Sequence, residues 1–180
     1  TTHFISVGCV YMNKENEKHV NKIDFKDKKQ LVVSVFDRSS GLISNIGINH
    51  HIEFYDKIIK FAIKHSNVKL LVKPKGEINE KILNYKNVTK NLNYLRKEKR
   101  IEILDHPTKV YRPIFESSFS ISLGHNTAGI ISGLLNNVSF FWDPSKLSNI
   151  DFNFPYEKGL FLNSKNVFLS LDELLKHIID

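Results

Sequence analysis

The sequence has one cysteine, one methionine and one tryptophan, and it lacks any long apolar run. Because Cys9 is the only cysteine, an internal disulfide and every metal site built from several cysteines are excluded. The absence of disulfides is usual for proteins of a reducing compartment. No apolar stretch approaches the roughly 20 residues that span a bilayer, and no basic segment followed by an apolar core opens the chain. We therefore predict a soluble, cytoplasmic protein.

Two common nucleotide-binding signatures are also missing. No G-x-G-x-x-G follows a predicted strand, and no Walker-type lysine loop is present, which argues against a dinucleotide dehydrogenase and a P-loop enzyme. His50 and His51 are adjacent, whereas two histidines that ligate one metal from a helix are spaced i, i+4. We therefore predict no metal site and no bound cofactor.

Positive charge is in excess, with a formal net charge of +7 and a pI near 9.4. The lysines are interspersed with acidic residues, and no stripe of arginines alternates with aromatic residues. This distribution argues against a nucleic-acid partner. A moderate positive field favours an anionic small molecule such as a nucleotide diphosphate, and it is compatible with peripheral association at the inner face of a membrane.

The size of the chain fits one globular domain. Its 180 residues, 41% hydrophobic and 25% charged, suffice for one well-buried core, so we assign residues 1–180 to a single domain. The first residue is Thr1 and the only methionine is Met12. We therefore expect the chain to be part of a larger protein.

Short apolar runs alternate with segments of helical periodicity, which is typical of βαβ units. We predict an α/β, Rossmann-like domain of three layers with a mostly parallel sheet. The expected strands are 31–36, 68–72, 101–104, 119–123, 138–142 and 167–169, with a further strand or lead-in at 4–11. The expected helices are 51–65, 109–115, 130–135 and 171–179, the last with Ser170 as its N-cap. Segment 79–99 is helical in part but too polar to contribute to the core, and segment 13–29 is a loop or surface helix.

The strongest candidate site is the turn between strand 119–123 and the helix after it. A strand, a small polar turn and an apolar helix together place free N–H groups and the positive end of a helix dipole at one point, which suits a diphosphate. The predicted binding residues are Gly124, His125, Asn126, Thr127, Ala128 and Gly129. Small residues there would let a ligand approach the backbone, and Asn126 and Thr127 could donate to it. Alternatively, one of these two residues only caps the helix.

Further candidates end the neighbouring strands, because ligands of doubly wound sheets bind at the carboxyl ends. Lys73 and Lys75 flank a proline and would add positive charge to a phosphate site, unless they are simply solvated. His106 is placed to meet a base or ribose, or else is a structural turn histidine. Asp37 and Asp143 are either catalytic carboxylates or, as we favour, turn residues. No catalytic residue is assigned.

The strand-end motifs resemble those of a known family. The relevant segments are LVVSVFDRSS (31–40), VKLLVKPKGE (68–77), RIEILDHP (100–107) and SFSISLGHNTAGIISGLLNNVSFFWDP (118–144). They resemble the C-terminal nucleotide-binding domain of GT-B glycosyltransferases, in particular bacterial surface-polysaccharide biosynthesis proteins. The resemblance implies a nucleotide-sugar donor as substrate and a role in capsule or lipopolysaccharide synthesis. It also implies that a missing N-terminal half supplies the catalytic base and binds a glycan or lipid-linked acceptor, so that the isolated domain is inactive.

The chain departs from the family pattern in the helix after the Gly124 turn. Many GT-B enzymes hold the ribose there with a glutamate, whereas residues 130–133 contain no carboxylate. Two alternatives therefore stay open. One is a GT-B-like sugar-nucleotide epimerase or polyol-phosphate transferase domain, and the other is a non-catalytic Rossmann-like interaction module.

Overall fold

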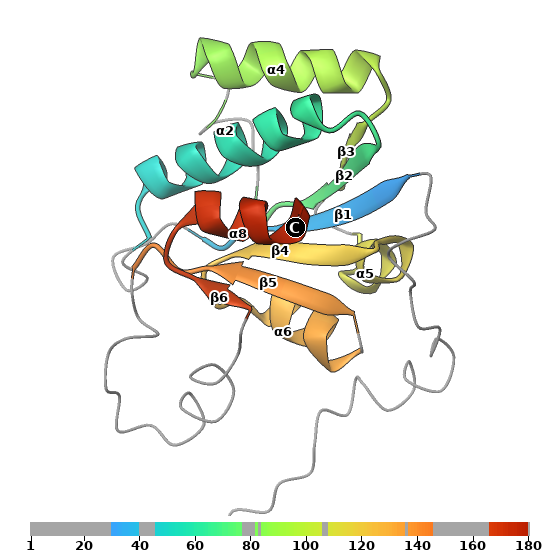
Figure 1. Cartoon of the computed structure of the whole chain (residues 1–180), viewed down its shortest axis with the longest axis vertical. Helices are drawn as coiled ribbons and strands as arrows, with labels where there is room; N and C mark the ends of the chain where they lie inside the picture. The colour runs from blue at the N-terminus through green and yellow to red at the C-terminus, as the bar shows by residue number, and fades with distance from the viewer. Residues whose placement is uncertain are drawn as a thin grey trace, which may run out of the picture.

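The structure, a computed structural model, describes residues 30–39, 46–76, 82, 84–105, 108–135, 137–145 and 166–179. Its centre is a six-stranded sheet in the order β3-β2-β1-β4-β5-β6, and every described strand pair is parallel. The strands are β1 (Leu31–Phe36), β2 (Val68–Lys73), β3 (Ile101–Ile103), β4 (Phe119–Leu123), β5 (Val138–Trp142) and β6 (Val167–Phe168). This architecture confirms the predicted Rossmann-like α/β fold (Figure 1).

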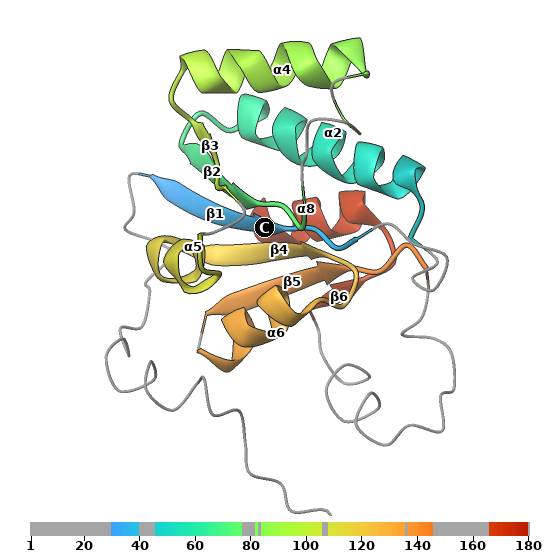
Figure 2. The same cartoon turned by 180° about the vertical axis from the view of Figure 1, so that it is seen from behind.

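Helices cover both faces of the sheet. One face carries α2 (Ile48–Lys64) and α8 (Leu171–Ile179), and α4 (Lys86–Lys97) packs beside α2 at the β3 end of the sheet. The other face carries α5 (Tyr111–Glu116) and α6 (Thr127–Leu134). Figures 1 and 2 show these three layers from opposite sides.

The two faces of the sheet differ in chemistry. Toward α2 the strands present large apolar side chains such as Val33, Ile121 and Trp142, which belong to the main core. Toward α6 the central strands present serines: Ser120 Oγ lies 2.9 Å from both Ser132 Oγ and Ser139 Oγ, and all three residues are buried. These small side chains satisfy one another's hydrogen-bonding groups, and their size allows α6 to pack closely on the sheet.

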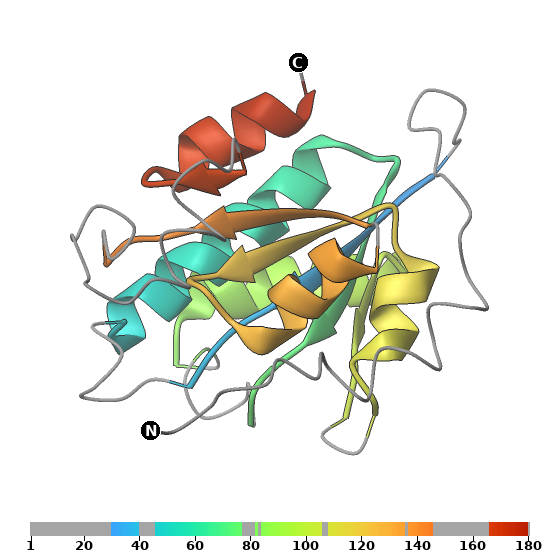
Figure 3. The same ribbon diagram turned by 90° about the horizontal axis from the view of Figure 1, so that it is seen from below.

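The strand order creates a crevice at one edge. The helix that follows β1 packs on one face, whereas the helix that follows its neighbour β4 packs on the other. The view from below shows α6 and α5 on their shared face (Figure 3). In doubly wound sheets, ligands bind at the carboxyl ends of the strands at such a reversal of direction. A ligand-binding site is therefore expected at the carboxyl ends of β1 and β4.

Arg100, at the start of β3, anchors the C-terminus of α2. Its Nη2 donates to the carbonyls of Ala62 and His65, the latter at 2.7 Å, and its Nε donates to the carbonyl of Val68 at 3.2 Å. The last carbonyls of a helix lack intrahelical partners and carry partial negative charge, so a guanidinium stabilises them.

We expect Arg100→Ala to lower the free energy of unfolding by about 1.5 kcal/mol, because carbonyls that were paired with a charged donor lose it. Urea denaturation measures the loss. Arg96→Ala, at an exposed position of α4, is the control and should change stability by less than about 0.5 kcal/mol. Equal losses in the two variants would contradict the anchoring role.

Most predicted elements agree with the structure to within a few residues. The clearest error concerns α4, whose residues Val88, Leu92 and Leu95 are buried, so this segment does contribute to the core. Two helices begin earlier than predicted, α2 at Ile48 and α6 at Thr127. Ser170 Oγ accepts from the Glu173 N–H at 3.4 Å, which confirms it as a cap. The predicted strand 4–11 and segment 13–29 lie outside the described residues.

Candidate functional site

A pocket of about 270 Å³ opens at the carboxyl ends of β1 and β2, beside the start of α6. Its walls come from these strand ends, from the start of α6 and from the segment that leads into α5: Phe36, Asp37, Lys73, Pro74, Lys75, Gly76, Val110, Asn126, Thr127, Ala128 and Ile131. The structure thus brings five of the predicted binding residues to one pocket, namely Lys73, Lys75, Asn126, Thr127 and Ala128.

Asn126 is the N-cap of α6. Its Oδ1 accepts from the Gly129 N–H at 2.9 Å, and its Nδ2 lies 3.4 Å from the carbonyl oxygens of both Phe36 and Leu123. The alternative capping role therefore applies to Asn126, which also ties α6 to the end of β1. The N–H groups of Thr127 and Ala128 begin the helix and have no acceptor within it. These two N–H groups are the helix donors nearest the pocket.

Gly124 and Gly129 have packing reasons to be glycine. Gly124 has φ +60°, and a Cβ there would lie 2.6 Å from Ile46 Cδ1. A Cβ on Gly129 would lie 2.7 Å from Phe141 Cε1 on the adjacent strand. In the G-x-G-x-x-G fingerprint, the first and third glycines serve a tight turn and close helix–strand packing, respectively. Gly124 and Gly129 have this spacing and these roles, whereas Asn126 replaces the middle glycine.

Asp37 joins three elements at the pocket wall. Its Oδ2 accepts from Tyr55 Oη of α2 at 2.8 Å, and its Oδ1 accepts from the backbone N–H of Lys75. The carboxylate that follows β1 therefore fixes the turn after β2, which carries Lys75 and directly follows Lys73, the last residue of β2. Lys73 faces Phe36 in register and its Nζ lies 3.5 Å from the carbonyl of Pro74, while Lys75 is exposed. Asp37 therefore has a structural role through partners that are distant in the sequence, whereas the sequence favoured a role within its own turn.

Tyr55 is 3% exposed, and burial together with the charge and hydrogen bond of Asp37 raises its pKa well above 10.0. In the unfolded chain Tyr55 loses its proton near pH 10, whereas in the folded protein it keeps the proton to higher pH. The unfolded state then binds fewer protons, so this residue's contribution to stability is present below pH 10 and falls as pH rises.

We expect Tyr55→Phe to cost about 1 kcal/mol of stability at pH 7, because the hydrogen bond to Asp37 is lost. The difference from the unsubstituted protein should shrink between pH 10 and pH 11, since phenylalanine does not titrate. Urea denaturation at pH 7, 10 and 11 measures this, and the other tyrosines cancel in the comparison. A constant difference across this range would argue against the raised pKa.

His125 contacts the end of β5. Its ring stacks on Phe141 with centroids 5.7 Å apart, and its Nε2 lies 3.8 Å from Oδ2 of the fully buried Asp143. Asp143 Oδ1 also accepts from Ser145 Oγ at 2.6 Å. The pocket, as far as the described residues define it, is lined by residues 126–128. It is not lined by three predicted binding residues next to them in the sequence, Gly124, His125 and Gly129.

The predictions for His106, for a metal site and for a membrane span do not depend on the pocket. His106 lies outside the described residues. The described ranges contain no group of three or more histidine, cysteine, aspartate or glutamate side chains that could hold a metal ion. They also contain no helix that is both long and apolar enough to cross a membrane.

Six residues that line the pocket were not among the predicted binding residues: Phe36, Asp37, Pro74, Gly76, Val110 and Ile131. Asp37 carried a weak signal, since it directly follows a buried strand. Val110 carried none, because its place in the wall depends on the path between β3 and α5.

The comparison with known families adds to this geometry. The family model described as "Polysaccharide biosynthesis PFTS motif protein" matches residues 1–163, which is most of the chain. No curated protein matches the chain, and no solved structure does. The family match confirms the predicted role in polysaccharide biosynthesis. The chain therefore belongs to the polysaccharide biosynthesis PFTS motif protein family.

Proposed function

We propose that this domain binds the nucleotide-sugar donor of a glycosyltransferase in surface-polysaccharide biosynthesis. The observation that carries the proposal is the pocket at the carboxyl edge of the sheet, where the start of α6 and two lysines converge. Unpaired N–H groups and a helix dipole attract phosphate, and lysines add point charges to such a site. The family's place in polysaccharide biosynthesis supports a sugar nucleotide among the possible anions.

The pocket residues divide into two groups by chemistry. The N–H groups of Thr127 and Ala128 and the ammonium groups of Lys73 and Lys75 suit the diphosphate. The side chains of Phe36, Val110 and Ile131 give an apolar wall against which a ribose or base packs. Ligand pockets usually measure about 300–1,000 Å³, so a pocket of about 270 Å³ holds part of a nucleotide sugar and the rest extends beyond it.

The chemistry expected of this half of the site is stabilisation of the leaving group. When the sugar is transferred, negative charge develops on the departing nucleoside diphosphate. Preorganised N–H donors and lysine charges at that position lower the energy of the transition state. The acceptor and the catalytic base are expected from another domain, so the isolated domain binds the donor without transferring the sugar.

Thermal unfolding with UDP, CMP, CDP and GDP compounds tests the proposal. A nucleotide at 100 times its Kd should stabilise the protein by about 2.7 kcal/mol. We expect at least one member of the panel to do so, and CMP to stabilise less than CDP because it lacks the second phosphate. If no compound stabilises the domain, the nucleotide proposal fails and the non-catalytic interaction module is favoured.

Lys73→Ala should weaken binding of the stabilising nucleotide by about tenfold, because one phosphate contact of roughly 1.4 kcal/mol is lost. Isothermal titration calorimetry measures the change. Lys69→Ala is the matched control, since Lys69 lies on the same strand and face but near its amino end, away from the pocket. It removes the same charge, so equal weakening in both variants would indicate a general effect of net charge and argue against this pocket.

A further inference from the structure

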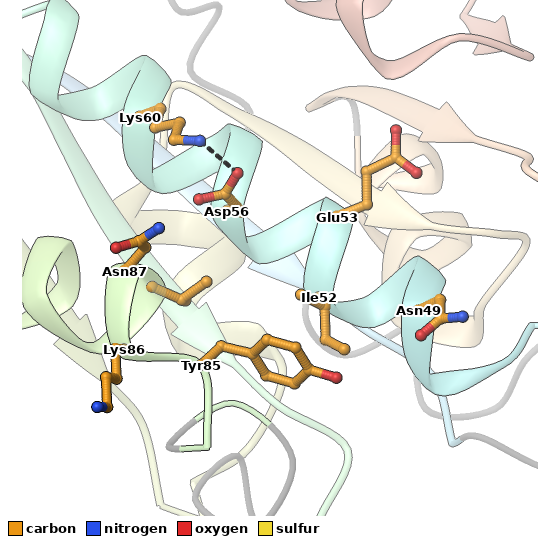
Figure 4. Close-up of a pocket in the computed structure, with 9 residues that line it drawn as sticks. Asn49, Ile52, Glu53, Asp56, Lys60, Tyr85, Lys86 and Asn87 are labelled. Carbon is orange, nitrogen blue, oxygen red and sulfur yellow. Dashed lines mark hydrogen bonds and ion pairs between the residues drawn. The ribbon is translucent and has the colours of Figure 1, made fainter.

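A second concave region lies on the α2 side of the molecule. It is an open groove of about 720 Å³ between residues 49–60 of α2 and the start of α4. Figure 4 shows Tyr85 beside Ile52, with polar side chains around the same opening. The residues lining it are Asn49, Ile52, Glu53, Asp56, Lys60, Tyr85, Lys86, Asn87 and Val88.

The groove combines one aromatic ring with several fixed hydrogen-bonding groups. Tyr85 is 42% exposed although it directly precedes α4, where its carbonyl accepts from the Thr89 N–H at 3.0 Å. The carboxylates of Glu53 and Asp56 are held by ion pairs of 2.9 Å to Lys57 and 2.6 Å to Lys60. Each paired carboxylate keeps further acceptor sites, and Asn49 and Asn87 supply both donors and acceptors.

The charges of the groove balance, unlike those of the pocket. Glu53 and Asp56 offset Lys60 and Lys86, so its lining has no net charge. The lining of the pocket, by contrast, has one carboxylate and two lysines, and the whole chain carries +7. A neutral groove on a basic protein suits an uncharged partner that is rich in hydrogen-bonding groups and has an apolar face for an aromatic ring.

The groove opens toward the same edge of the sheet as the pocket. Because α2 and α4 follow the parallel strands β1 and β2, both helices begin near the carboxyl edge (Figure 1). The pocket lies beyond the ends of β1 and β2 on the α6 side. The groove and the pocket therefore both lie toward the carboxyl edge of the sheet, on opposite faces of it.

We propose that this groove binds a neutral carbohydrate chain, such as a segment of the polysaccharide that the family helps to make. A sugar ring would stack on Tyr85, and its hydroxyl groups would pair with Asn87, Asp56 and their neighbours. The proposal goes beyond donor binding and depends on the groove alone. It adds a glycan contact to the half of the protein expected to hold only the nucleotide sugar.

NMR titration with neutral tri- to pentasaccharides of glucose, galactose and N-acetylglucosamine tests the proposal. Concentrations should reach about 10 mM, which nearly saturates a site with a Kd of about 1 mM. We expect shifts confined to residues 49–60 of α2 and the start of α4, and about tenfold weaker binding in Tyr85→Ala. Tyr94→Ala is the matched control, because Tyr94 is 49% exposed in α4, the helix that Tyr85 directly precedes, and does not line the groove.

Three outcomes would overturn the inference: no binding to any neutral oligosaccharide at that concentration, equal binding by Tyr85→Ala and the unsubstituted protein, or tighter binding of an acidic oligosaccharide such as a hyaluronan tetrasaccharide. Asn87→Ala, at an exposed position, provides a second variant should Tyr85→Ala unfold. Nucleotide stabilisation should be the same in all these variants. Loss of nucleotide binding with retained glycan binding would count against the donor proposal alone.

Discussion

Replacing Gly129 by alanine should destabilise the protein by about 2 kcal/mol, although alanine is the better helix former by about 1 kcal/mol. A Cβ at this position would lie 2.7 Å from Phe141 Cε1 and 3.1 Å from Ser122 Cβ. Both neighbours are buried in adjacent strands, so neither can move without disturbing the sheet. Overpacking of this kind costs roughly 1–3 kcal/mol and exceeds the gain in helix propensity.

Gly133→Ala is the matched control in the same helix. A Cβ at Gly133 would lie 3.8 Å from Ser139 Cβ, an ordinary contact, and the residue is exposed. The same substitution there should therefore stabilise the protein by up to about 1 kcal/mol. Urea denaturation of both variants gives the two values, and their opposite signs form the prediction. If both alanines stabilise, α6 does not pack on β4 and β5 as closely as the structure shows.

The Gly129 result also bears on the proposed site. Moving α6 away from the sheet would displace the N–H groups of Thr127 and Ala128 from the lysines across the pocket. Gly129→Ala should then weaken nucleotide binding even though Gly129 does not line the described pocket, whereas Gly133→Ala should leave it unchanged. Measuring affinity well below the melting temperature separates this effect from unfolding.

The strands were predictable because each carries its own signal. Segments such as LVVSVF and VSFFW are continuous apolar runs, as strands buried on both faces require, and β1, β4 and β5 begin and end where the sequence predicts. The sequence also predicted which edge of the sheet holds the pocket, because parallel strands bring their carboxyl ends together. The sequence therefore predicted that Thr127, Ala128 and the two lysines lie near one another, as they do in the pocket.

What the sequence did not predict depends on contacts between distant residues. Val88, Leu92 and Leu95 form an apolar stripe, but the lysines and asparagines between them lower the average hydrophobicity of α4. The packing role of Gly129 was not predicted, because the side chains that a Cβ there would meet lie on β4 and β5. Asp37 gave no sign of its role, since Tyr55 and Lys75 lie 18 and 38 residues away.

Asp37→Ala should have the largest effect on stability, a loss of about 3 kcal/mol. The substitution removes the acceptor for a tyrosine hydroxyl that is buried and for the N–H of Lys75. A buried polar group left without its partner costs about 1–3 kcal/mol, and the bond to a charged acceptor adds to this loss. Asp37→Asn should recover at least half of the loss, because its amide oxygen still accepts from Lys75 while its NH₂ group can donate to Tyr55 Oη.

Nucleotide affinity separates the positioning role of Asp37 from its charge. The carboxylate is the only acidic group among the residues that line the described pocket, so its charge disfavours a diphosphate. Asp37→Asn keeps the turn after β2 in place and removes that charge, and should therefore bind the stabilising nucleotide as tightly as the unsubstituted protein or up to about tenfold more tightly. Asp37→Ala removes the same charge but frees the turn that carries Lys75 and directly follows Lys73, and should bind about tenfold more weakly. If the two variants bind equally, the hydrogen bond to Lys75 does not position the lysines, and Asp37 acts at this pocket through its charge alone.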